Sequence, residues 1–209
     1  MNIEVLPQDN GFVVLLDGQK LMGAFGELPL WFETEASARH YAETADKQVD
    51  NMQAALQTLI TQLRYNTGQP MHLNAEGIQQ ALNADALFYP YPGPESVEQY
   101  AYFEPMRAFL EKQGFAWRDL DQSEPYTATE AEPLLLIIQN LSLAQQARLL
   151  YLMLNTRNLF VAPLAYITGD ISQEAFMGAW LFNEGSSVSK KSKAYQGLEG
   201  MLQKLNTYN

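Results

Sequence analysis

The first 32 residues show the short alternations and turn signals that are typical of β-strands. Ile3 and Val5 alternate with polar neighbours, and Phe12–Leu16 is an apolar run rich in β-prone residues. Asp9-Asn10-Gly11 indicates a turn, and Asp17-Gly18 indicates a hairpin because both residues tolerate the positive φ of a tight turn. The pattern predicts a small antiparallel β unit that needs a partner to be stable. The further strands expected are Lys20–Phe25 and Pro29–Phe32.

From Thr34 onward, apolar residues recur at spacings of three and four, which predicts amphipathic helices. Thr34, Asn74 and Ser172 are expected N-caps, and Ser142 with Gln145 has the spacing of a capping box. A longer helix is expected to open at Gly93-Pro94-Glu95, with proline in the first helical position, and to close at Gly114. The predicted fold class is α+β, with an N-terminal antiparallel β unit over residues 1–33 and an α-helical region over 34–209.

Composition mainly excludes classes of function. The 209 residues include 24 acidic and 13 basic ones, a net charge of −11, which argues against nucleic-acid binding because phosphate contacts need clustered Lys and Arg. The absence of cysteine excludes disulfides and thiolate chemistry. The apolar stretches Leu134–Ile138 and Leu159–Ile167 are much shorter than the roughly 20 residues that cross a bilayer. We expect a soluble intracellular protein that inserts into no membrane.

Catalytic and metal chemistry have little support in the sequence. His40 and His72 lie in no triad context, and no phosphate-binding glycine loop occurs, so we predict no enzyme activity, catalytic residue or cofactor. Asp119, Asp121 and Glu130 imitate the positions of an EF-hand calcium loop. Glu124 stands where that loop needs glycine, however, and a solvated acidic linker is the preferred interpretation over a metal site.

Two further segments each allow two interpretations. Phe88–Pro92, which reads Phe-Tyr-Pro-Tyr-Pro, could line a ligand groove or form an extended connection whose rings pack on the core. The lysines at 190, 191 and 193 could form a solvated helix face or dock an acidic partner. The stretch that holds them, Ser186–Leu205, is expected to be helical in part.

Several segments, taken in order, resemble the ATP12 family of assembly chaperones for the F1 sector of ATP synthase. The resemblance rests on Gly11–Leu21 as the opening strand, Ala84–Tyr89 in place of an Asp-Leu-Leu-x-Tyr segment, Phe103–Met106 in place of Trp-Asp-Pro-Leu, and Gly169–Ala175 as a late turn. It covers about residues 3–184. The family's C-terminal Leu-Asp-Glu motif corresponds here to Leu181–Glu184, which reads Leu-Phe-Asn-Glu.

The resemblance implies an ATP12-like fold and a chaperone that binds the α subunit of F1 before assembly, with no cofactor or metal. The partner-binding residues that it implies are Trp180, Asn183 and Glu184. The N-terminus does not read as an Arg-rich, acid-poor leader, so we expect a bacterial cytoplasm, or the mitochondrial matrix if the host is a eukaryote, and a monomer. Two alternatives stay open: a divergent ATP12-fold protein that binds another protein, and an enzyme whose acid and base come from carboxylates distant in sequence.

Overall fold

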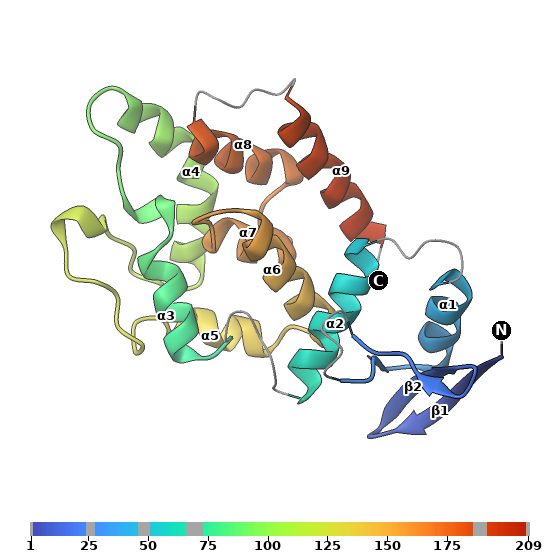
Figure 1. Ribbon diagram of the computed structural model, residues 1–209. Coiled ribbons are helices and arrows are strands. Elements are labelled where there is room, and N and C mark those ends of the chain that lie inside the picture. Colours follow the sequence, from blue (N-terminus) through green and yellow to red (C-terminus); the bar gives the residue numbers. More distant parts are fainter. Residues whose placement is uncertain (1, 24–27, 46–50, 66–72, 186–191, 208–209) are drawn as a thin grey trace. The chain divides into compact units, whose positions relative to one another are not determined.

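The computed structural model describes residues 2–23, 28–45, 51–65, 73–185 and 192–207 (Figure 1). His72, Lys190 and Lys191 lie outside these residues. The described chain groups into two compact units, which are considered one at a time. The first comprises Met1–Pro70 with Ser142–Tyr151, and the second comprises Met71–Leu141 with Leu152–Asn209. Within the described ranges, no helix combines the length and the apolarity that crossing a membrane requires.

The first unit begins with the predicted antiparallel sheet. Its strands are β1 (Ile3–Gln8), β2 (Gly11–Leu16), β3 (Gln19–Lys20) and β4 (Trp31–Phe32). β2 pairs with β1, β3 and β4, and every pairing is antiparallel. The two tight turns have positive φ throughout, 51° and 59° at Asp9 and Asn10, then 49° and 81° at Asp17 and Gly18. The hairpin predicted at Asp17-Gly18 is therefore confirmed.

The apolar face of this sheet packs on α1 (Glu35–Ala45), which completes a small core. The buried members of this core are Val14, Leu30, Phe32, Ala38, Tyr41 and Ala42. Phe32 and Tyr41 meet at a ring-centroid distance of 5.2 Å. The β unit thus gains the partner that its size requires, and a division after residue 33 stays a prediction.

Helix α2 (Asn51–Tyr65) is tied to β4 and to the first turn of the sheet. The Thr61 hydroxyl accepts a hydrogen bond from the backbone N–H of Trp31 at 3.0 Å, and Gln57 donates to the Trp31 carbonyl. The hydroxyl of Tyr65 donates to the carboxylate of Asp9 at 2.9 Å. The contacts from Thr61 and Gln57 satisfy backbone groups of Trp31, and the contact from Tyr65 holds the turn between β1 and β2.

The second unit consists mainly of helices (Figure 1). They are α3 (Ala75–Asn83), α4 (Glu95–Lys112), α5 (Glu132–Gln139), α7 (Val161–Ile167), α8 (Gln173–Glu184) and α9 (Lys193–Thr207), with single 3₁₀ turns η1 (Ala86–Phe88) and η2 (Leu120–Gln122). Helix α6 (Leu143–Asn155) begins in the first unit and ends in the second. The prediction that the chain after Thr34 is mainly helical is confirmed.

The helix boundaries follow the predicted capping chemistry closely. Asn74 and Ser172 accept hydrogen bonds from backbone N–H groups three residues on, and Ser142 and Gln145 form the reciprocal pair of a capping box. Gly114 has a φ of 73° just after α4. One detail was wrong: Pro94 precedes the first helical residue instead of occupying it. The partly helical tail is confirmed as α9.

Candidate functional site

A buried aspartate organises the segment that follows α3. Asp85 is 1% exposed, and its Oδ2 accepts hydrogen bonds from the backbone N–H groups of Phe160 and Val161, both at 2.7 Å. Its Oδ1 accepts from the N–H of Leu87 at 2.8 Å. Because α7 begins at Val161, Asp85 caps that helix from a position 76 residues earlier. We call Asp85, Leu87, Phe160 and Val161 the Asp85 junction.

Burial controls the ionisation of this carboxyl. Desolvation raises the pKa of Asp85 to about 6, and the three N–H donors oppose that rise because they stabilise the ionised form. A side chain that is fully enclosed and fully hydrogen-bonded has little capacity to act on a substrate. Its role is to hold the chain segments around it in place.

A second buried polar side chain, Gln99 of α4, fixes the aromatic segment. Gln99 is 0% exposed; its amide donates to the carbonyls of Ala86 and Tyr89 at 3.2 and 3.0 Å, and its oxygen accepts from the N–H of Tyr91 at 2.7 Å. Three backbone groups of an irregular segment are thereby satisfied. Phe88 is buried within this segment, whereas Tyr89 and Tyr91 are 42% and 38% exposed. Phe88 thus packs as expected for a connection, whereas the ligand groove that the sequence also allowed stays a prediction.

The exposed tyrosines line a cleft of about 750 Å³ at the C-terminal end of α8. The other side chains on its walls are mainly amides and prolines, together with one arginine and one glutamate; the lining comprises Asn83, Ala84, Ala86, Tyr89, Pro90, Tyr91, Pro92, Arg157, Asn158, Asn183 and Glu184. We call it the α8 cleft. It offers hydrogen-bond donors, acceptors and ring faces, which suits a polypeptide more than a reaction centre.

The structure brings together two of the three residues that the family resemblance implies for partner binding. Asn183 and Glu184 both line the α8 cleft, and the Asn183 amide donates to the backbone carbonyl of Arg157 at 2.8 Å. Gly185, with a φ of 74°, ends the helix directly after them. Trp180 is 5% exposed and packs against Tyr195 of α9 at a ring-centroid distance of 6.4 Å, so a partner would reach little of its surface. The partner-binding role of all three residues stays a prediction.

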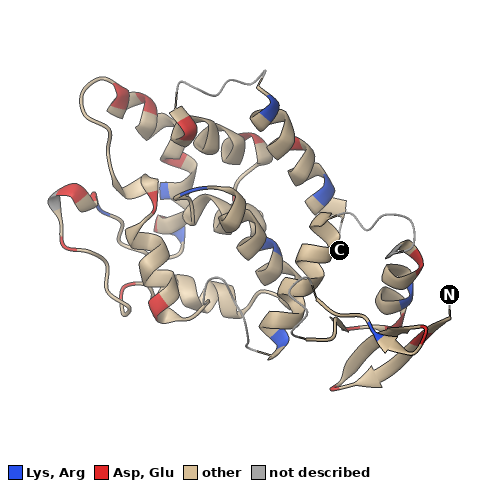
Figure 2. Ribbon diagram, viewed as in Figure 1, with Lys and Arg blue, Asp and Glu red and all other residues tan. Residues whose placement is uncertain are grey.

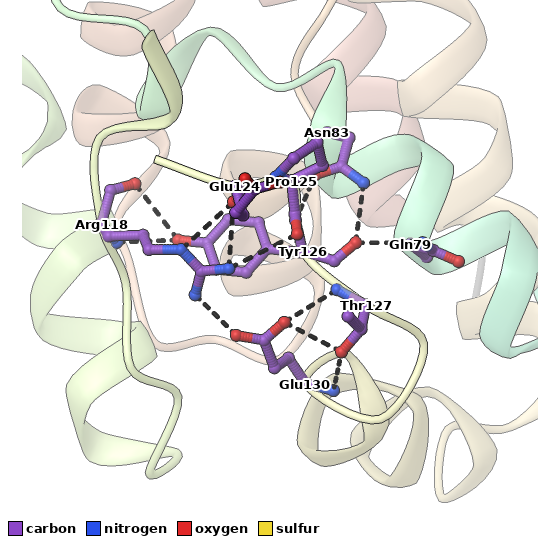
Figure 3. Close-up of polar contacts among 8 residues, drawn as sticks. All are labelled: Gln79, Asn83, Arg118, Glu124, Pro125, Tyr126, Thr127 and Glu130. Atoms are coloured by element: carbon purple, nitrogen blue, oxygen red, sulfur yellow. Dashed lines mark hydrogen bonds and ion pairs between the residues drawn. The ribbon is translucent and has the colours of Figure 1, made fainter. Parts of the chain in front are cut away.

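The loop that imitates an EF-hand is organised by an arginine (Figure 3). The Arg118 guanidinium contacts Glu130 Oε1 at 2.6 Å, donates to the carbonyl of Glu124 at 3.1 Å, and lies over the ring of Tyr126. The other oxygen of Glu130 accepts from the N–H and hydroxyl of Thr127 at 2.8 and 2.9 Å. Hydrogen bonds from Arg118 and then Thr127 lower the pKa of Glu130 to about 2. Glu130 is therefore committed to organising the loop.

The acidic residues of this loop are directed to separate contacts. Asp119 accepts a hydrogen bond from the hydroxyl of Tyr100 at 3.0 Å, while Glu130 is paired with Arg118. Within the described ranges, no three His, Asp or Glu side chains are grouped so that they could hold a metal ion. Asp119 and Glu130 thus belong to different contacts within a structured loop.

Tyr126 connects this loop to the cleft. Its ring is fully buried, and its hydroxyl accepts from the N–H of Arg118 at 2.7 Å. Asn83, which lines the α8 cleft, donates to the Tyr126 carbonyl at 3.0 Å and accepts from its N–H at 2.8 Å, and Gln79 donates to the same carbonyl (Figure 3). The Asn83 amide is thus held in one orientation, which fixes one wall of the cleft.

Sequence reasoning assigned no structural role to Asp85, Gln99 or Tyr126. Asp85 carries a local signal, because an aspartate two residues before a turn N–H is the pattern of an Asx turn. Gln99 and Tyr126 carry none. The side chain of Gln99 bonds a backbone group of another segment, and the backbone of Tyr126 is bonded by the side chain of Asn83. Their importance is visible only once those elements are assembled.

No protein-family model and no curated protein sequence matches the chain, whereas solved structures do. Atp12 from Paracoccus denitrificans superposes with a TM-score of 0.64 at 15% identity, covering 99% of this chain and 91% of that one. The chain has the Atp12 fold. A substituted variant of the same Atp12 gives a TM-score of 0.61 at 17% identity with the same coverage. A candidate chaperone from Agrobacterium tumefaciens gives 0.63 at 18% identity, covering 96% of this chain and 78% of that one.

The Atp12 fold confirms the architecture that the ordered motifs imply. The match extends over nearly the whole chain, so the small sheet and the helices that follow occur together in both proteins. At these identities the likeness establishes the fold, and function has to be argued from the surface of this chain. The structural neighbours are Atp12 and a candidate chaperone, which are non-enzymatic families.

Proposed function

We propose that this protein is an ATP12-like assembly chaperone that binds the α subunit of the F1 sector of ATP synthase before assembly. The observation that carries the proposal is the Atp12 fold over 99% of the chain. The α8 cleft supports it, because Asn183 and Glu184, the residues in the position of the family's C-terminal motif, lie together on its wall. The proposed location is the bacterial cytoplasm, or the mitochondrial matrix in a eukaryotic host.

The physical task of such a chaperone is to cover a surface that is meant for another subunit. An α subunit without its β partner exposes apolar area and aggregates. A protein that binds only this form stabilises it by mass action and releases it when the β subunit competes. This task requires a surface with both polar and aromatic groups and no cofactor, which agrees with the lining of the α8 cleft.

The direct test uses purified F1 α subunit. A stoichiometric amount of the protein should suppress light scattering by α subunit that is diluted out of denaturant, and the two should elute together from a gel-filtration column. Purified β subunit is the matched control and should gain no protection. Failure to bind the α subunit would contradict the proposal.

A divergent protein with this fold that binds another partner is the second candidate. Its support is Asn183, which stands where the family motif has an acidic residue. An amide cannot form the charge-assisted bond that a carboxylate forms, so the partner surface could differ. Protection of neither F1 subunit, together with a stable complex with a different purified protein, would favour this candidate.

A further inference from the structure

A pocket of about 430 Å³ lies between the start of α4 and the end of α8, next to the α8 cleft. It is lined by Tyr91, Glu95, Glu98, Tyr102, Leu181, Phe182 and Gly185. We call it the tyrosine pocket. Tyr91 belongs to both hollows, so a chain bound in the cleft can continue into the pocket.

Three aromatic rings form the wall of the tyrosine pocket. Phe182 lies 5.4 Å from Tyr91 with the rings nearly perpendicular, at 86°, and 5.5 Å from Tyr102 at 33°. Tyr91 and Tyr102 are 38% and 43% exposed, so ring surface remains open to solvent. Such surface is favourable to cover, and the negative faces of the rings attract a cation.

The rim of the pocket is acidic. Glu95 and Glu98 occupy the first turn of α4, both are exposed, and both line the pocket. Among the described residues that line it, none is Lys or Arg. The start of α4 stands out as acidic in Figure 2. Two carboxylates at a helix start are favourable in their own right, but here they also flank three aromatic rings.

Two other sites in the second unit show that its aromatic rings pack against guanidinium groups. The guanidinium of Arg107 lies 4.0 Å from the ring centre of Tyr100 and 4.8 Å from that of Trp117. Arg118 lies 4.2 Å from the ring centre of Tyr126, and its ion pair with Glu130 adds a carboxylate. Each of these sites combines aromatic faces with a guanidinium from the chain itself. The tyrosine pocket has the rings and the carboxylates, and no lysine or arginine is among the described residues of its lining.

We propose that the tyrosine pocket takes an arginine side chain of a bound polypeptide. The guanidinium stacks on Tyr91 or Tyr102 and forms ion pairs with Glu95 and Glu98. A neighbouring hollow of about 230 Å³ shares Tyr102 and Leu181 with the pocket and adds apolar side chains such as Met177. The recognised segment is therefore an arginine next to apolar residues. This inference deepens the proposed chaperone function and rests on it for the nature of the bound chain.

The pocket depends on a glycine that admits one of its rings. A Cβ at Gly178 of α8 would lie 3.2 Å from Cδ1 of Tyr102, so a larger residue there would displace the ring. Tyr102 therefore lies against the backbone of α8. The position of its ring is built into the packing of α4 on α8.

The test is calorimetric titration with a blocked peptide that carries one arginine between leucines. Its matched control replaces arginine with citrulline, which keeps the shape and removes the charge. We expect the arginine peptide to bind about 10-fold more tightly, the size of a cation–π contact at an exposed site combined with ion pairing. Equal binding of the two peptides would overturn the proposal. Equal binding of arginine and lysine peptides would overturn the assignment to a guanidinium.

Two variants address the pocket itself. Tyr102→Leu should weaken binding of the arginine peptide about 10-fold. The double variant Glu95→Gln with Glu98→Gln changes exposed side chains only, and should weaken it by about 5-fold at low salt, with the difference shrinking at high salt. Glu104→Gln, on an exposed position of α4 outside the pocket, is the control and should change nothing. Unchanged binding by both pocket variants would overturn the proposal.

The two proposals can fail separately. If the α subunit does not bind but the arginine peptide does, and the pocket variants weaken it, the proposed partner is wrong and the pocket stands. If the α subunit binds wild type and both pocket variants with one affinity, the chaperone function stands and the tyrosine pocket is no part of it.

Discussion

The sheet of the first unit and the Asp85 junction of the second are stabilised by different kinds of contact. In the sheet, backbone groups pair with one another between strands, and apolar side chains of β2 and α1 form the core. At the junction, a buried carboxylate bonds directly to backbone N–H groups 75 and 76 residues away. The sheet is specified by short-range patterns. The junction depends on one side chain, and two of its three partners lie far along the sequence.

This difference has consequences for tolerance to mutation. The sheet has many similar contacts, each of which contributes little. A conservative substitution at one position therefore removes only a small part of the stabilising free energy. The Asp85 junction concentrates three hydrogen bonds on two oxygen atoms. Removing one of those oxygens leaves buried donors without a partner, and each such donor costs free energy of unfolding.

Asp85→Asn should give the largest loss of stability. An amide offers one acceptor oxygen where the carboxylate offers two, and its NH₂ would face backbone donors. We expect the free energy of unfolding to fall by about 2–4 kcal/mol, measured by urea denaturation at pH 7. Asp121→Asn, at an exposed position, is the control and should change it little. A variant as stable as wild type would contradict the account of the junction.

Wild type and Asp85→Asn, compared at several pH values, also test the direction of the pKa shift of Asp85. Because this pKa is raised to about 6 from 3.8, the folded chain binds the proton more tightly than the unfolded chain. The contribution of Asp85 to stability therefore grows as the pH falls from 7 toward 4. The difference in unfolding free energy between wild type and Asp85→Asn should widen over that range, and a difference that narrows would contradict the direction of the shift.

Gly11→Ala examines the sheet at its tightest point. A Cβ at Gly11 would lie 2.4 Å from ring atoms of Trp31 and 2.5 Å from the backbone oxygen of Phe32, so a strand would have to move. We expect a loss of about 1–3 kcal/mol in urea denaturation. Gly197→Ala, in α9 with open space around it, is the matched control and should gain about 0.5–1 kcal/mol. If both substitutions stabilise the protein, the close approach of Trp31 is wrong.

Arg118→Met should have a smaller effect that depends on pH. It removes the ion pair to Glu130 and the bonds to the carbonyl of Glu124, so the urea midpoint at pH 7 should fall below that of wild type. The pKa of Glu130 is lowered to about 2 from 4.5. The ionised Glu130 therefore stabilises the folded chain fully above pH 4.5, and this stabilisation is lost as the pH falls toward 2.

The measurement is the urea midpoint of wild type and Arg118→Met between pH 7 and 2.5. The two midpoints should converge as the pH falls. Arg39→Met, which removes an exposed pair with Glu35, is the control and should show a difference that is small at every pH. Midpoints that stay equally far apart down to pH 2.5 would contradict the role of Glu130.

The contrast between sheet and junction also explains what could be predicted from sequence. Turn residues such as Asp17-Gly18 and caps such as Asn74 act on neighbours within a few positions. The hairpin and the N-cap could therefore be predicted from local sequence, and both were confirmed. The order of motifs was sufficient for the Atp12 fold. The contacts of Gln99 and Asn83 could not be predicted, because a polar residue in a helix gives no sign of which carbonyl of another segment it meets.

The candidate site was predictable in part for the same reason. Asn183 and Glu184 are the last residues of α8, just before Gly185, and both line the α8 cleft. Trp180, which precedes the Leu181–Glu184 motif and was expected to bind the partner as well, packs against Tyr195, a contact that depends on where α9 lies. The tyrosine pocket combines α4 with α8, and its residues are about 80 positions apart, so no local pattern could indicate it.

The measurement that tests the central claim most directly is a calorimetric titration of F1 α subunit with wild type, Glu184→Ala and Asn183→Ala. Glu43→Ala, at an exposed position of α1, is the matched control. The account predicts that wild type and the control bind alike, and that Glu184→Ala weakens binding by about 1–3 kcal/mol while its melting temperature stays close to that of wild type. Equal affinities across all four proteins would contradict the claim that the α8 cleft is the surface that binds this subunit.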